Sequence, residues 1–532
     1  MGSAPSKPAS PTTPVEKSNA AYVHHVSADR TARIQAEQQH RASRWTQHDQ
    51  LDADAPGEGT AEIALDRLDE WHQDAFAAPT SRLAAMTLHN ANIADSLHVR
   101  DAEITNQHVF THSVPLHAKA VTNQKSSGRC WLFALTNLIR LEVIKQLDIK
   151  DADFELSQSY LHFCDKLEKA NFFLENVIEL ADRAWDDREL SFLSSSFYSD
   201  GGQWDMVTSL IVKYGVVPQS VFPESFNSSN TSRINWLVTV KVREMAQELR
   251  DLKAVSEERL AASVASGRLT PAQRDAAVLG TLRAHKQKQM KDVYRMLAIA
   301  YGKPPRPHEE FEFSWYDSKG RYQSLRTTPY DFQVKYTGTF TAKGSCSLVH
   351  DPRNEPNKLI TVSRLGNIWG AEPVRYVNTD PELMMRKVVE SVKAGHAVFF
   401  GCDVGQFSHT PSGIMDTKLY DYEHAFGITL GLTKKERLQM GESQMTHAMV
   451  IDAVHLDAKT GAPLRFAVQN SWGSTAGKEG YMVMSAEWFC QFVYQVVIRK
   501  EFVPKDLWTL FENGVDDRSI VLPCYDPMGA LA

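Results

Sequence analysis

The chain lacks the features of a protein stapled by disulfides, built around a metal or anchored in a membrane. It has six cysteines in 532 residues, at positions 130, 164, 346, 402, 490 and 524. Their spacing does not resemble a disulfide framework, so we expect free thiols and a reducing compartment. No Cys-x-x-Cys pair or His/Cys cluster has metal-ligand spacing, so we expect no metal and no other cofactor. No apolar run approaches the roughly eighteen residues of a membrane span, and no secretory signal opens the chain.

Excess positive charge is also absent. The 58 Lys and Arg residues are outnumbered by 65 Asp and Glu residues, giving a formal net charge of −7. A general coat for nucleic acid is therefore not expected. One basic run, Arg283, His285, Lys286, Lys288 and Lys291, lies on a predicted helix and leaves a ring-shaped nucleic-acid-binding protein as the alternative function. Such runs are usually a solvated helix face.

The first sixty residues have few bulky apolar side chains. Pro, Ser, Ala and Thr dominate the start, and Gln, His, Arg and Asp follow, a composition that predicts a disordered extension over residues 1–60. Gly2 formally fits a myristoylation pattern, which also arises by chance, so we expect no membrane association unless Gly2 is lipidated. The arginines of this segment also resemble a transit peptide. We predict a cytoplasmic protein, with a mitochondrial form as the alternative.

Cys130 stands where a polar, glycine-bearing loop runs into an apolar segment. The sequence is Gln124-Lys-Ser-Ser-Gly-Arg-Cys130-Trp-Leu-Phe-Ala134, which predicts a thiol at the start of a helix. Unpaired N–H groups and the helix dipole there favour thiolate and lower the cysteine pKa. A lone cysteine is more often an inert buried thiol. A thiol oxidoreductase, a third function considered, lacks a second cysteine near Cys130.

Two downstream residues supply what a nucleophilic thiol requires. His447 lies in Met-Thr-His447-Ala-Met, and Asn470 lies in Val-Gln-Asn470-Ser-Trp472-Gly. Alone, either is more often a core histidine or a turn asparagine. Cysteine, histidine and asparagine in this order, each in a fitting context, form a papain-type triad of nucleophile, base and orienting group.

Further motifs extend this pattern along the chain. They include Glu155-Leu-Ser-Gln-Ser-Tyr160, Asp165-Lys-Leu-Glu-Lys-Ala-Asn171, Asp200-Gly-Gly-Gln203, Lys213-Tyr-Gly215, Leu365-Gly-Asn367 and Asp526-Pro-Met-Gly-Ala-Leu-Ala532. With the Cys130 segment, they resemble the bleomycin hydrolase branch of the papain-like cysteine peptidases from about residue 66 to the end. The resemblance implies hydrolysis of peptide substrates from a free N-terminus and a homohexamer.

The resemblance also assigns supporting residues. Gln124 matches the glutamine of the oxyanion hole, and Trp472 matches the tryptophan that shields the His–Asn hydrogen bond. Gly201 and Gly202 match the strip that pairs with substrate backbone. The C-terminal arm implies a cleft-filling segment whose terminal carboxylate, on Ala532, meets the substrate amine. Without the resemblance, a frayed terminus is the default for such a segment.

The patterns predict an α+β enzyme of two lobes, a helical lobe and a β-barrel-like lobe, with helical insertions and the C-terminal arm in the cleft between them. We expect helices from near residue 61, over 131–147, 157–167 and 170–180, and in two pieces between 235 and 297. Strands are expected at 311–316, 360–362, 397–401, 448–456, 464–469, 481–485 and 493–498. The predicted units are 61–230 with the nucleophile, 231–385 as an insertion for oligomer contacts, 386–505 with His447 and Asn470, and 506–532 as the arm.

Overall fold

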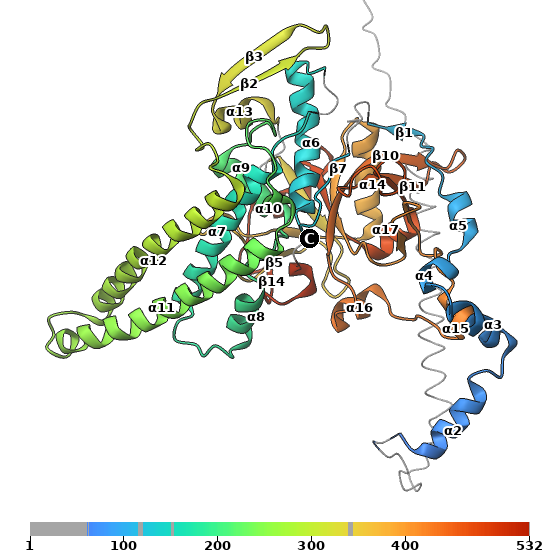
Figure 1. The fold of residues 1–532 in the computed structure, drawn as a ribbon, viewed down its shortest axis with the longest axis horizontal. Helices are drawn as coiled ribbons and strands as arrows, with labels where there is room; N and C mark the ends of the chain where they lie inside the picture. Colours follow the sequence, from blue (N-terminus) through green and yellow to red (C-terminus); the bar gives the residue numbers. More distant parts are fainter. Residues whose placement is uncertain (1–60, 62, 115–120, 151–153, 339–343, 531–532) are drawn as a thin grey trace, which may run out of the picture.

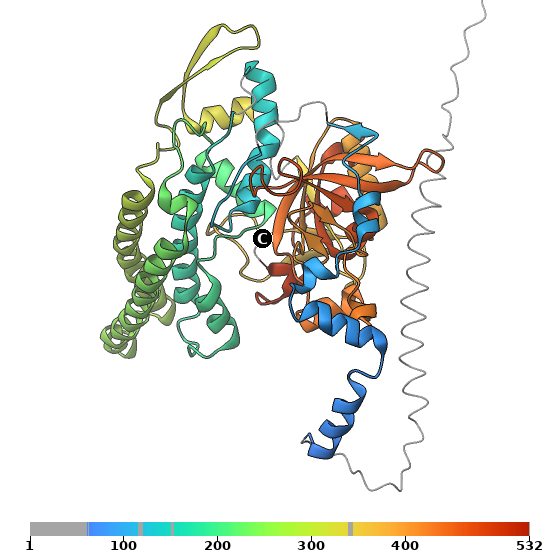
Figure 2. The same ribbon diagram turned by 45° about the vertical axis from the view of Figure 1, so that its right-hand side comes forward.

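Two lobes lie side by side in this chain. The computed structural model describes residues 61, 63–114, 121–150, 154–338 and 344–530. One lobe is helical and the other is built on a 12-stranded sheet (Figures 1 and 2). The α+β architecture expected from the sequence is therefore confirmed. The predicted extension over 1–60 and the call on Ala532 fall outside the described residues.

The helical lobe is organised around one buried helix that begins at the candidate nucleophile. Its main helices are α6 (Cys130–Leu147), α7 (Gln158–Glu179), α9 (Trp204–Tyr214), α11 (Ser232–Ala265), α12 (Pro271–Tyr301) and α13 (Pro329–Tyr336), with α8 (Arg188–Ser196) and α10 (Phe226–Ser229) as shorter pieces. Every residue of α6 from Cys130 to Arg140 is buried. A helix that is apolar on all sides can be stable only inside a core, as the sequence pattern predicted.

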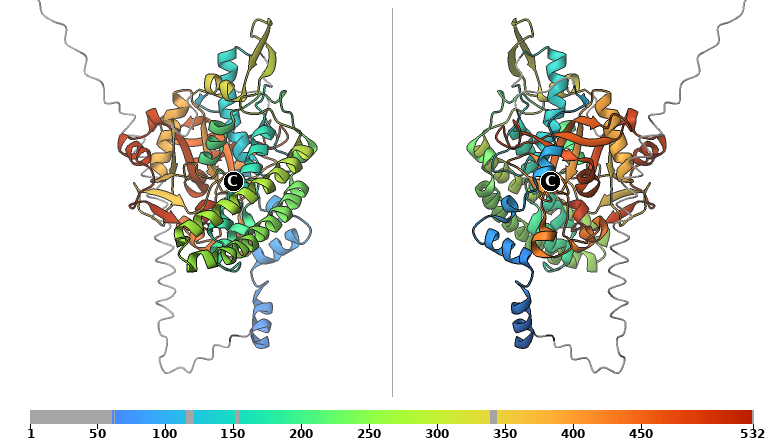
Figure 3. Two further views of the ribbon diagram at one scale, coloured as in Figure 1. Left: turned by 90° about the vertical axis from the view of Figure 1, so that its left-hand side faces the viewer. Right: turned by 90° about the vertical axis from the view of Figure 1, so that its right-hand side faces the viewer.

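Helices α11 and α12 form a long hairpin that projects from this lobe (Figure 1; Figure 3, left). The turn forms where the sequence indicates a break: Gly267 has a φ of +72°. Thr270 and Gln273 then form a reciprocal capping box, with a proline at the first helical position of α12. Caps of this kind satisfy the N–H groups that have no partner inside the helix.

Helix α7 differs from the expectation of two helices at 157–167 and 170–180. It is continuous, and Ser157 caps its start by accepting from the Tyr160 N–H. An ion pair between Lys169 and Asp165, one turn apart, spans the predicted break at 2.7 Å. No glycine or proline interrupts this stretch, so nothing breaks the helix.

The sheet of the second lobe runs in the order β14-β5-β6-β4-β13-β7-β10-β11-β12-β9-β8, with β1 also paired to β10. Its strands are β1 (His112–Ser113), β4 (Ser345–Val349), β5 (Leu359–Val362), β6 (Tyr376–Asn378), β7 (Val398–Cys402), β8 (Ser408–His409), β9 (Ile414–Met415), β10 (His447–Leu456), β11 (Pro463–Gln469), β12 (Tyr481–Ser485), β13 (Val493–Arg499) and β14 (Ile520–Leu522). A separate hairpin joins β2 (Phe311–Tyr316) to β3 (Tyr322–Thr327). All seven strands expected from the sequence are present, with ends shifted by a residue or so.

Further helices surround the sheet lobe. They are α14 (Pro381–Lys393), α15 (Tyr422–Phe426), α16 (Lys434–Met440), α17 (Ala486–Phe492) and α18 (Lys505–Glu512), with 3₁₀ turns η1 (Lys500–Phe502) and η2 (Pro527–Gly529). Helices α14, α17 and α18 bury their apolar residues in the second core cluster, together with the sheet. The described residues contain no helix long and apolar enough to cross a bilayer.

The N-terminal segment consists of short helices along the outside of the sheet lobe. They are α2 (Leu65–Asp74), α3 (Pro79–Leu88), α4 (Ile93–Ser96) and α5 (Arg100–Thr105). Helices α2, α3 and α4 bury no residue. In the views of Figures 1 to 3, α2 stands clear of the main body. A helix near residue 61 is confirmed, but its apolar side chains Leu65, Leu68 and Trp71 are exposed.

Strand pairing brings the two downstream site residues together. His447 is the first residue of β10 and lies opposite Cys402 of β7. Strand β11 runs antiparallel to β10 with Gln469 opposite Val450. Asn470, the next residue, therefore emerges beside the start of β10.

Candidate active site

His447 and Asn470 form a defined hydrogen bond. Their Nε2 and Oδ1 atoms are 2.9 Å apart. The Ser471 backbone N–H also donates to Asn470 Oδ1, at 2.7 Å, while Asn470 Nδ2 lies 3.3 Å from the Met482 sulfur. Since Oδ1 is an acceptor, His447 Nε2 carries the proton that is donated. In the neutral ring, Nδ1 is then unprotonated and available as a base.

Cys130 lies at the first position of α6, as the loop-to-helix pattern predicted. It is 2 % exposed. Its sulfur is hydrogen-bonded by the backbone N–H of Ala448, the residue after His447. The nucleophile candidate therefore contacts the strand that carries the base candidate, although 447 − 130 = 317 positions separate them in sequence.

Burial governs the ionisation of both groups. It raises the pKa of Cys130 to about 11, because it outweighs the Ala448 N–H that favours thiolate. It also lowers the pKa of His447 to about 4, against the opposing effect of the Asn470 hydrogen bond. The expectation that the helix terminus lowers the thiol pKa is wrong for this closed site, since removal from water is the larger effect. Charge therefore arises in this pair by moving one proton from sulfur to imidazole.

Trp472 covers the histidine. The two ring centroids are 4.8 Å apart, with the ring planes tilted by 33°. Trp472, which lies after the end of β11, forms an isolated antiparallel bridge with Asn123 in the loop before Cys130. This contact is compatible with the role that the resemblance implies for Trp472, which is to shield the His–Asn hydrogen bond from water.

Gln124 is buried and held from two sides. Its Oε1 accepts from the Ser471 hydroxyl at 2.6 Å, and its Nε2 donates to the Ser127 carbonyl at 2.6 Å. One amide proton of Gln124 remains beyond that bond. Sequence reasoning missed Ser471, which contacts both Gln124 and Asn470 and stands between Asn470 and Trp472.

The Gly201-Gly202 strip lies against the helix of the nucleophile. A Cβ on Gly202 would come within 2.6 Å of the Trp131 indole. The Trp131 Nε1 donates to the Asp200 carbonyl at 2.8 Å. Glycine is therefore required at 202 by close packing on the residue after Cys130.

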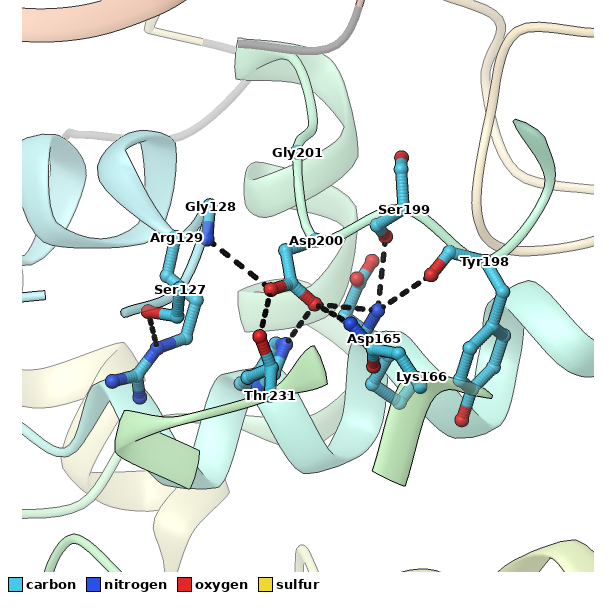
Figure 4. Close-up of polar contacts among 12 residues, drawn as sticks. Ser127, Gly128, Arg129, Asp165, Lys166, Tyr198, Ser199, Asp200, Gly201 and Thr231 are labelled. Carbon is cyan, nitrogen blue, oxygen red and sulfur yellow. Dashed lines mark hydrogen bonds and ion pairs between the residues drawn. The ribbon is translucent and has the colours of Figure 1, made fainter. Parts of the chain in front are cut away.

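Asp200, just before this strip, joins four segments (Figure 4). One carboxylate oxygen accepts from the Gly128 N–H at 3.2 Å and from the Thr231 hydroxyl at 2.5 Å. The other accepts from Asn235 at 2.8 Å and pairs with Lys166 Nζ at 2.7 Å. These contacts of Asp200 fix the position of the loop before Cys130 relative to the Gly201-Gly202 strip. The sequence did not reveal it.

The pKa values of Asp200, Lys166 and His162 depend on one another. Burial acts to raise the pKa of Asp200, but Lys166 and a hydrogen bond from His162 hold it far below its usual range. Burial lowers the pKa of Lys166 to about 8 and that of His162 to about 4, in both cases against the attraction of Asp200. Asp200 is therefore an anion close to the nucleophile, and its charge contributes to the raised pKa of Cys130.

The C-terminal segment reaches the strip. Gln203, next to Gly202, donates a short hydrogen bond to the Ala530 carbonyl. In Figures 1 and 2 this last described stretch, in red, lies between the two lobes. A cavity of about 320 Å³ lies beside it, lined by Gly529 and Ala530 and by Met445 and Thr446 from the segment just before His447.

Part of the basic run on α12 is paired with acidic side chains. Arg283 and Lys286 both pair with Glu175 of α7, and His285 lies 3.6 Å from Glu248. These contacts reduce the positive charge that the helix presents to a polyanion. Within the described ranges, no group of three or more His, Cys, Asp or Glu side chains is arranged to hold a metal ion.

Comparison with known proteins agrees with this geometry. A model of the Peptidase C1-like family matches residues 62–529. "Bleomycin hydrolase" of Homo sapiens is 40% identical over 434 residues, covering 80% of this chain and 89% of that protein. "Aminopeptidase C" of Lactobacillus delbrueckii subsp. lactis is 38% identical over 475 residues, covering 88% and 99%. "Cysteine proteinase 1, mitochondrial" of Saccharomyces cerevisiae is 37% identical over 481 residues, covering 89% and 94%.

The fold is shared with a solved relative. The crystal structure of PepW from Lactobacillus rhamnosis HN001 superposes with a TM-score of 0.80 at 39% identity, covering 89% of this chain and 100% of that one. The chain therefore belongs to the Peptidase C1-like family and is a papain-like cysteine peptidase of the bleomycin hydrolase and aminopeptidase C group.

Proposed function

We propose that this enzyme is an aminopeptidase that removes N-terminal residues from peptides and aminoacyl amides through Cys130, His447 and Asn470. The observation that carries the proposal is the bond of His447 Nε2 to Asn470 Oδ1, because it leaves Nδ1 as the basic nitrogen. The Ala448 N–H on the Cys130 sulfur supports placing that nitrogen and the thiol in one site.

The reaction follows from these roles. The thiol proton of Cys130 passes to His447 Nδ1 as sulfur attacks the scissile carbonyl. The imidazolium then gives that proton to the departing amine, leaving a thioester on Cys130. His447 next takes a proton from water, the hydroxide attacks the thioester, and the proton returns to sulfur as the N-terminal residue leaves as a free acid.

The developing oxyanion requires hydrogen-bond donors. Cys130 begins α6, where backbone N–H groups have no partner within the helix. Gln124 supplies the amide proton that is not used by Ser127. Each such donor typically contributes about 3 kcal/mol to transition-state stabilisation. Ser471 orients the Gln124 amide so that its nitrogen, not its oxygen, remains for this role.

Restriction to free N-termini is attributed to the C-terminal arm. Ala530 is bonded to Gln203 beside the Gly201-Gly202 strip, so the arm obstructs residues upstream of the scissile bond. A carboxylate at the end of such an arm pairs with a substrate ammonium. The related Lactobacillus protein named an aminopeptidase supports this specificity.

The compartment stays a prediction. We propose a cytoplasmic enzyme, with a mitochondrial form as the alternative because a yeast relative is named as mitochondrial.

The proposal is tested with matched thiol variants. Cys130→Ala should lower kcat/KM on a free aminoacyl fluorogenic amide by roughly 10⁴-fold or more. Cys346→Ala, which removes another fully buried thiol, should retain activity. The N-acetylated form of the same substrate should be turned over poorly by the wild type. Full activity of Cys130→Ala, or equal turnover of both substrates, would reject the proposal.

A further inference from the structure

The C-terminal arm leaves the edge of the sheet and crosses to the cleft. Strand β14 pairs in parallel with β5, with Leu522 opposite Val362. The chain then turns through η2 and ends its described course at Ala530 on Gln203. Beyond the sheet, hydrogen bonds and ion pairs hold the arm at Ala530 and at a point nearer β14, and Tyr525 also packs on Arg188 and Phe192 of α8.

The attachment nearer β14 is a two-pronged ion pair. Arg353 Nη2 lies 2.7 Å from Asp526 Oδ1, and Arg353 Nη1 lies 3.0 Å from Asp526 Oδ2. The side chains of Arg353 and Asp526 are only 15 % and 10 % exposed. Partial burial and fork geometry distinguish this pair from an ordinary surface ion pair, which contributes little.

The guanidinium is fixed from its other side as well. Arg353 Nε and Nη2 donate to the two carboxylate oxygens of Asp351, at 2.9 and 2.8 Å. Asp351 is fully buried, and its backbone is bonded to the Asn378 amide at the end of β6. The Arg353 side chain is therefore held in one orientation on the sheet lobe and is preorganised to bind the arm.

Asp526 also shapes the arm. Its Oδ1 accepts from the Met528 N–H at 2.9 Å and caps η2. Met528 is fully buried. A Cβ on Gly529 would lie 2.9 Å from Val362 Cγ1, so the arm is pressed against β5 at this point. A shift at Asp526 would therefore propagate directly to Ala530, four residues on.

We infer that the Arg353–Asp526 pair determines specificity by fixing how far the C-terminal arm enters the cleft. Arg353 acts through the arm and not on the reacting atoms, so it is a positioning residue. The inference rests on the proposed aminopeptidase function. With the pair intact, the arm obstructs substrates whose amine is blocked or extended. With the pair weakened, the arm leaves the strip part of the time and admits them.

Asp526→Asn is the main test, because it removes the charge but keeps an oxygen for the Met528 N–H. It also leaves Arg353 paired with Asp351. The quantity measured is kcat/KM for one aminoacyl fluorogenic amide with a free amine and for its N-acetylated form. We expect the ratio of free to acetylated to fall by roughly tenfold, the loss typical of one charge-assisted pair. Arg353→Lys, which keeps the charge but not the fork, should lower the ratio by a smaller factor.

A coupled variant and a matched control complete the test. Because both residues act through one contact, the double variant Arg353→Lys/Asp526→Asn should change the ratio no more than Asp526→Asn alone. Asp516→Asn breaks an Arg–Asp pair of the same chemistry, with Arg518, that lies on the surface before β14. It should leave the ratio unchanged.

The outcomes distinguish failure of this inference from failure of the proposed aminopeptidase function. Deletion of residues 523–532 should abolish discrimination, as the upper limit of arm release. If that deletion lowers the ratio but Asp526→Asn and Arg353→Lys do not, the inference is overturned and the aminopeptidase proposal stands. If the wild type turns over both substrates equally, the aminopeptidase proposal fails and the inference fails with it.

Discussion

Asn470 determines which nitrogen of His447 is left without a proton in the neutral ring. Its side-chain oxygen accepts hydrogen bonds from His447 Nε2 and from the Ser471 N–H. These two bonds fix the orientation of the amide, because a flipped amide would lose both of them. The proton on Nε2 is therefore held, and in the proposed mechanism Nδ1 is the atom that gains and loses a proton. On that proposal, a single amide determines which nitrogen of a buried histidine acts as the base.

The ionisation of Cys130 and His447 predicts the acid limit of activity. The lowered pKa of His447, about 4, means that its imidazole is neutral above that pH and charged below it. Above pH 4 the pair holds one proton, on sulfur or on Nδ1, and loses its base as pH falls through about 4. We expect kcat/KM on a free-amine substrate to fall with an apparent pKa near 4 and to be level from there to neutrality.

Inactivation by iodoacetamide provides the control, because it does not depend on ionisation of the substrate. Its rate at Cys130 should show the same acid step. An acid step near 6.5, the ordinary value for histidine, would contradict the burial described for His447. Asp200→Asn, which removes a charge that raises the pKa of Cys130, should shift any alkaline step downward. Thr231→Val, which removes one hydrogen bond to Asp200 but keeps its charge, should not.

Site residues could be predicted where each has its own local signal. Cys130 follows a glycine-bearing loop, and Asn470 precedes a Ser-Trp-Gly turn. Asp200 and Ser471 have no such signal, because their roles come from partners far away in sequence. Ser471 meets Gln124 across 347 residues, and Asp200 meets Gly128 across 72. The direction of the Cys130 pKa was missed for the same reason: helix position is local, but burial is not.

At the scale of elements, apolar patterns predicted the strands that have long apolar runs but not several short or polar strands. Strands β10, β11, β12 and β13 have long apolar or β-branched runs and were located closely. Strands β4 and β6 were missed, since a short buried strand has no distinctive alternation. Strand β3 is polar and exposed on alternate residues, and it is formed by pairing with β2. Long-range pairing therefore decides elements that the local sequence leaves open.

The packing of the strip on α6 gives a second prediction. Gly202→Ala would place a methyl group 2.6 Å from the Trp131 indole. The methyl group would displace the indole, which should lower the free energy of unfolding by about 1–3 kcal/mol. It should also reduce kcat/KM, since Trp131 adjoins Cys130. Denaturant titration and kinetics measure the two effects.

Gly280→Ala is the matched control for that substitution. Gly280 lies inside α12, and a Cβ there has no atom within 4 Å. Alanine should therefore raise the free energy of unfolding by about 0.5–1 kcal/mol through helix propensity and leave activity unchanged. Equal effects of the two substitutions would show that the close approach of Gly202 to Trp131 has no consequence.

At the scale of the whole molecule, apolar surface remains uncovered on the projecting hairpin. Trp236 on α11 is 61 % exposed and Ile299 on α12 is 81 % exposed. Phe226 of α10, 78 % exposed, lies beside the end of α12, since Asn227 bonds to the Ala300 carbonyl. Exposed apolar side chains on these neighbouring helices favour a protein interface. They support the proposal, made from the family resemblance, that copies of this chain assemble into a homohexamer.

Assembly through this hairpin predicts a specific response to charge. Ile299→Glu and Trp236→Glu would each bury a carboxylate in the contact, which is strongly unfavourable without a partner. In a closed ring every copy repeats the same contact, so one substitution weakens all of them together. Sedimentation velocity at micromolar concentration should show a hexamer for the wild type and smaller species for both variants. Gln287→Glu adds the same charge at an exposed polar position of α12 and should leave the hexamer intact. A wild-type monomer would contradict the assembly itself, whereas a hexamer that survives both apolar substitutions would place its contacts on another surface.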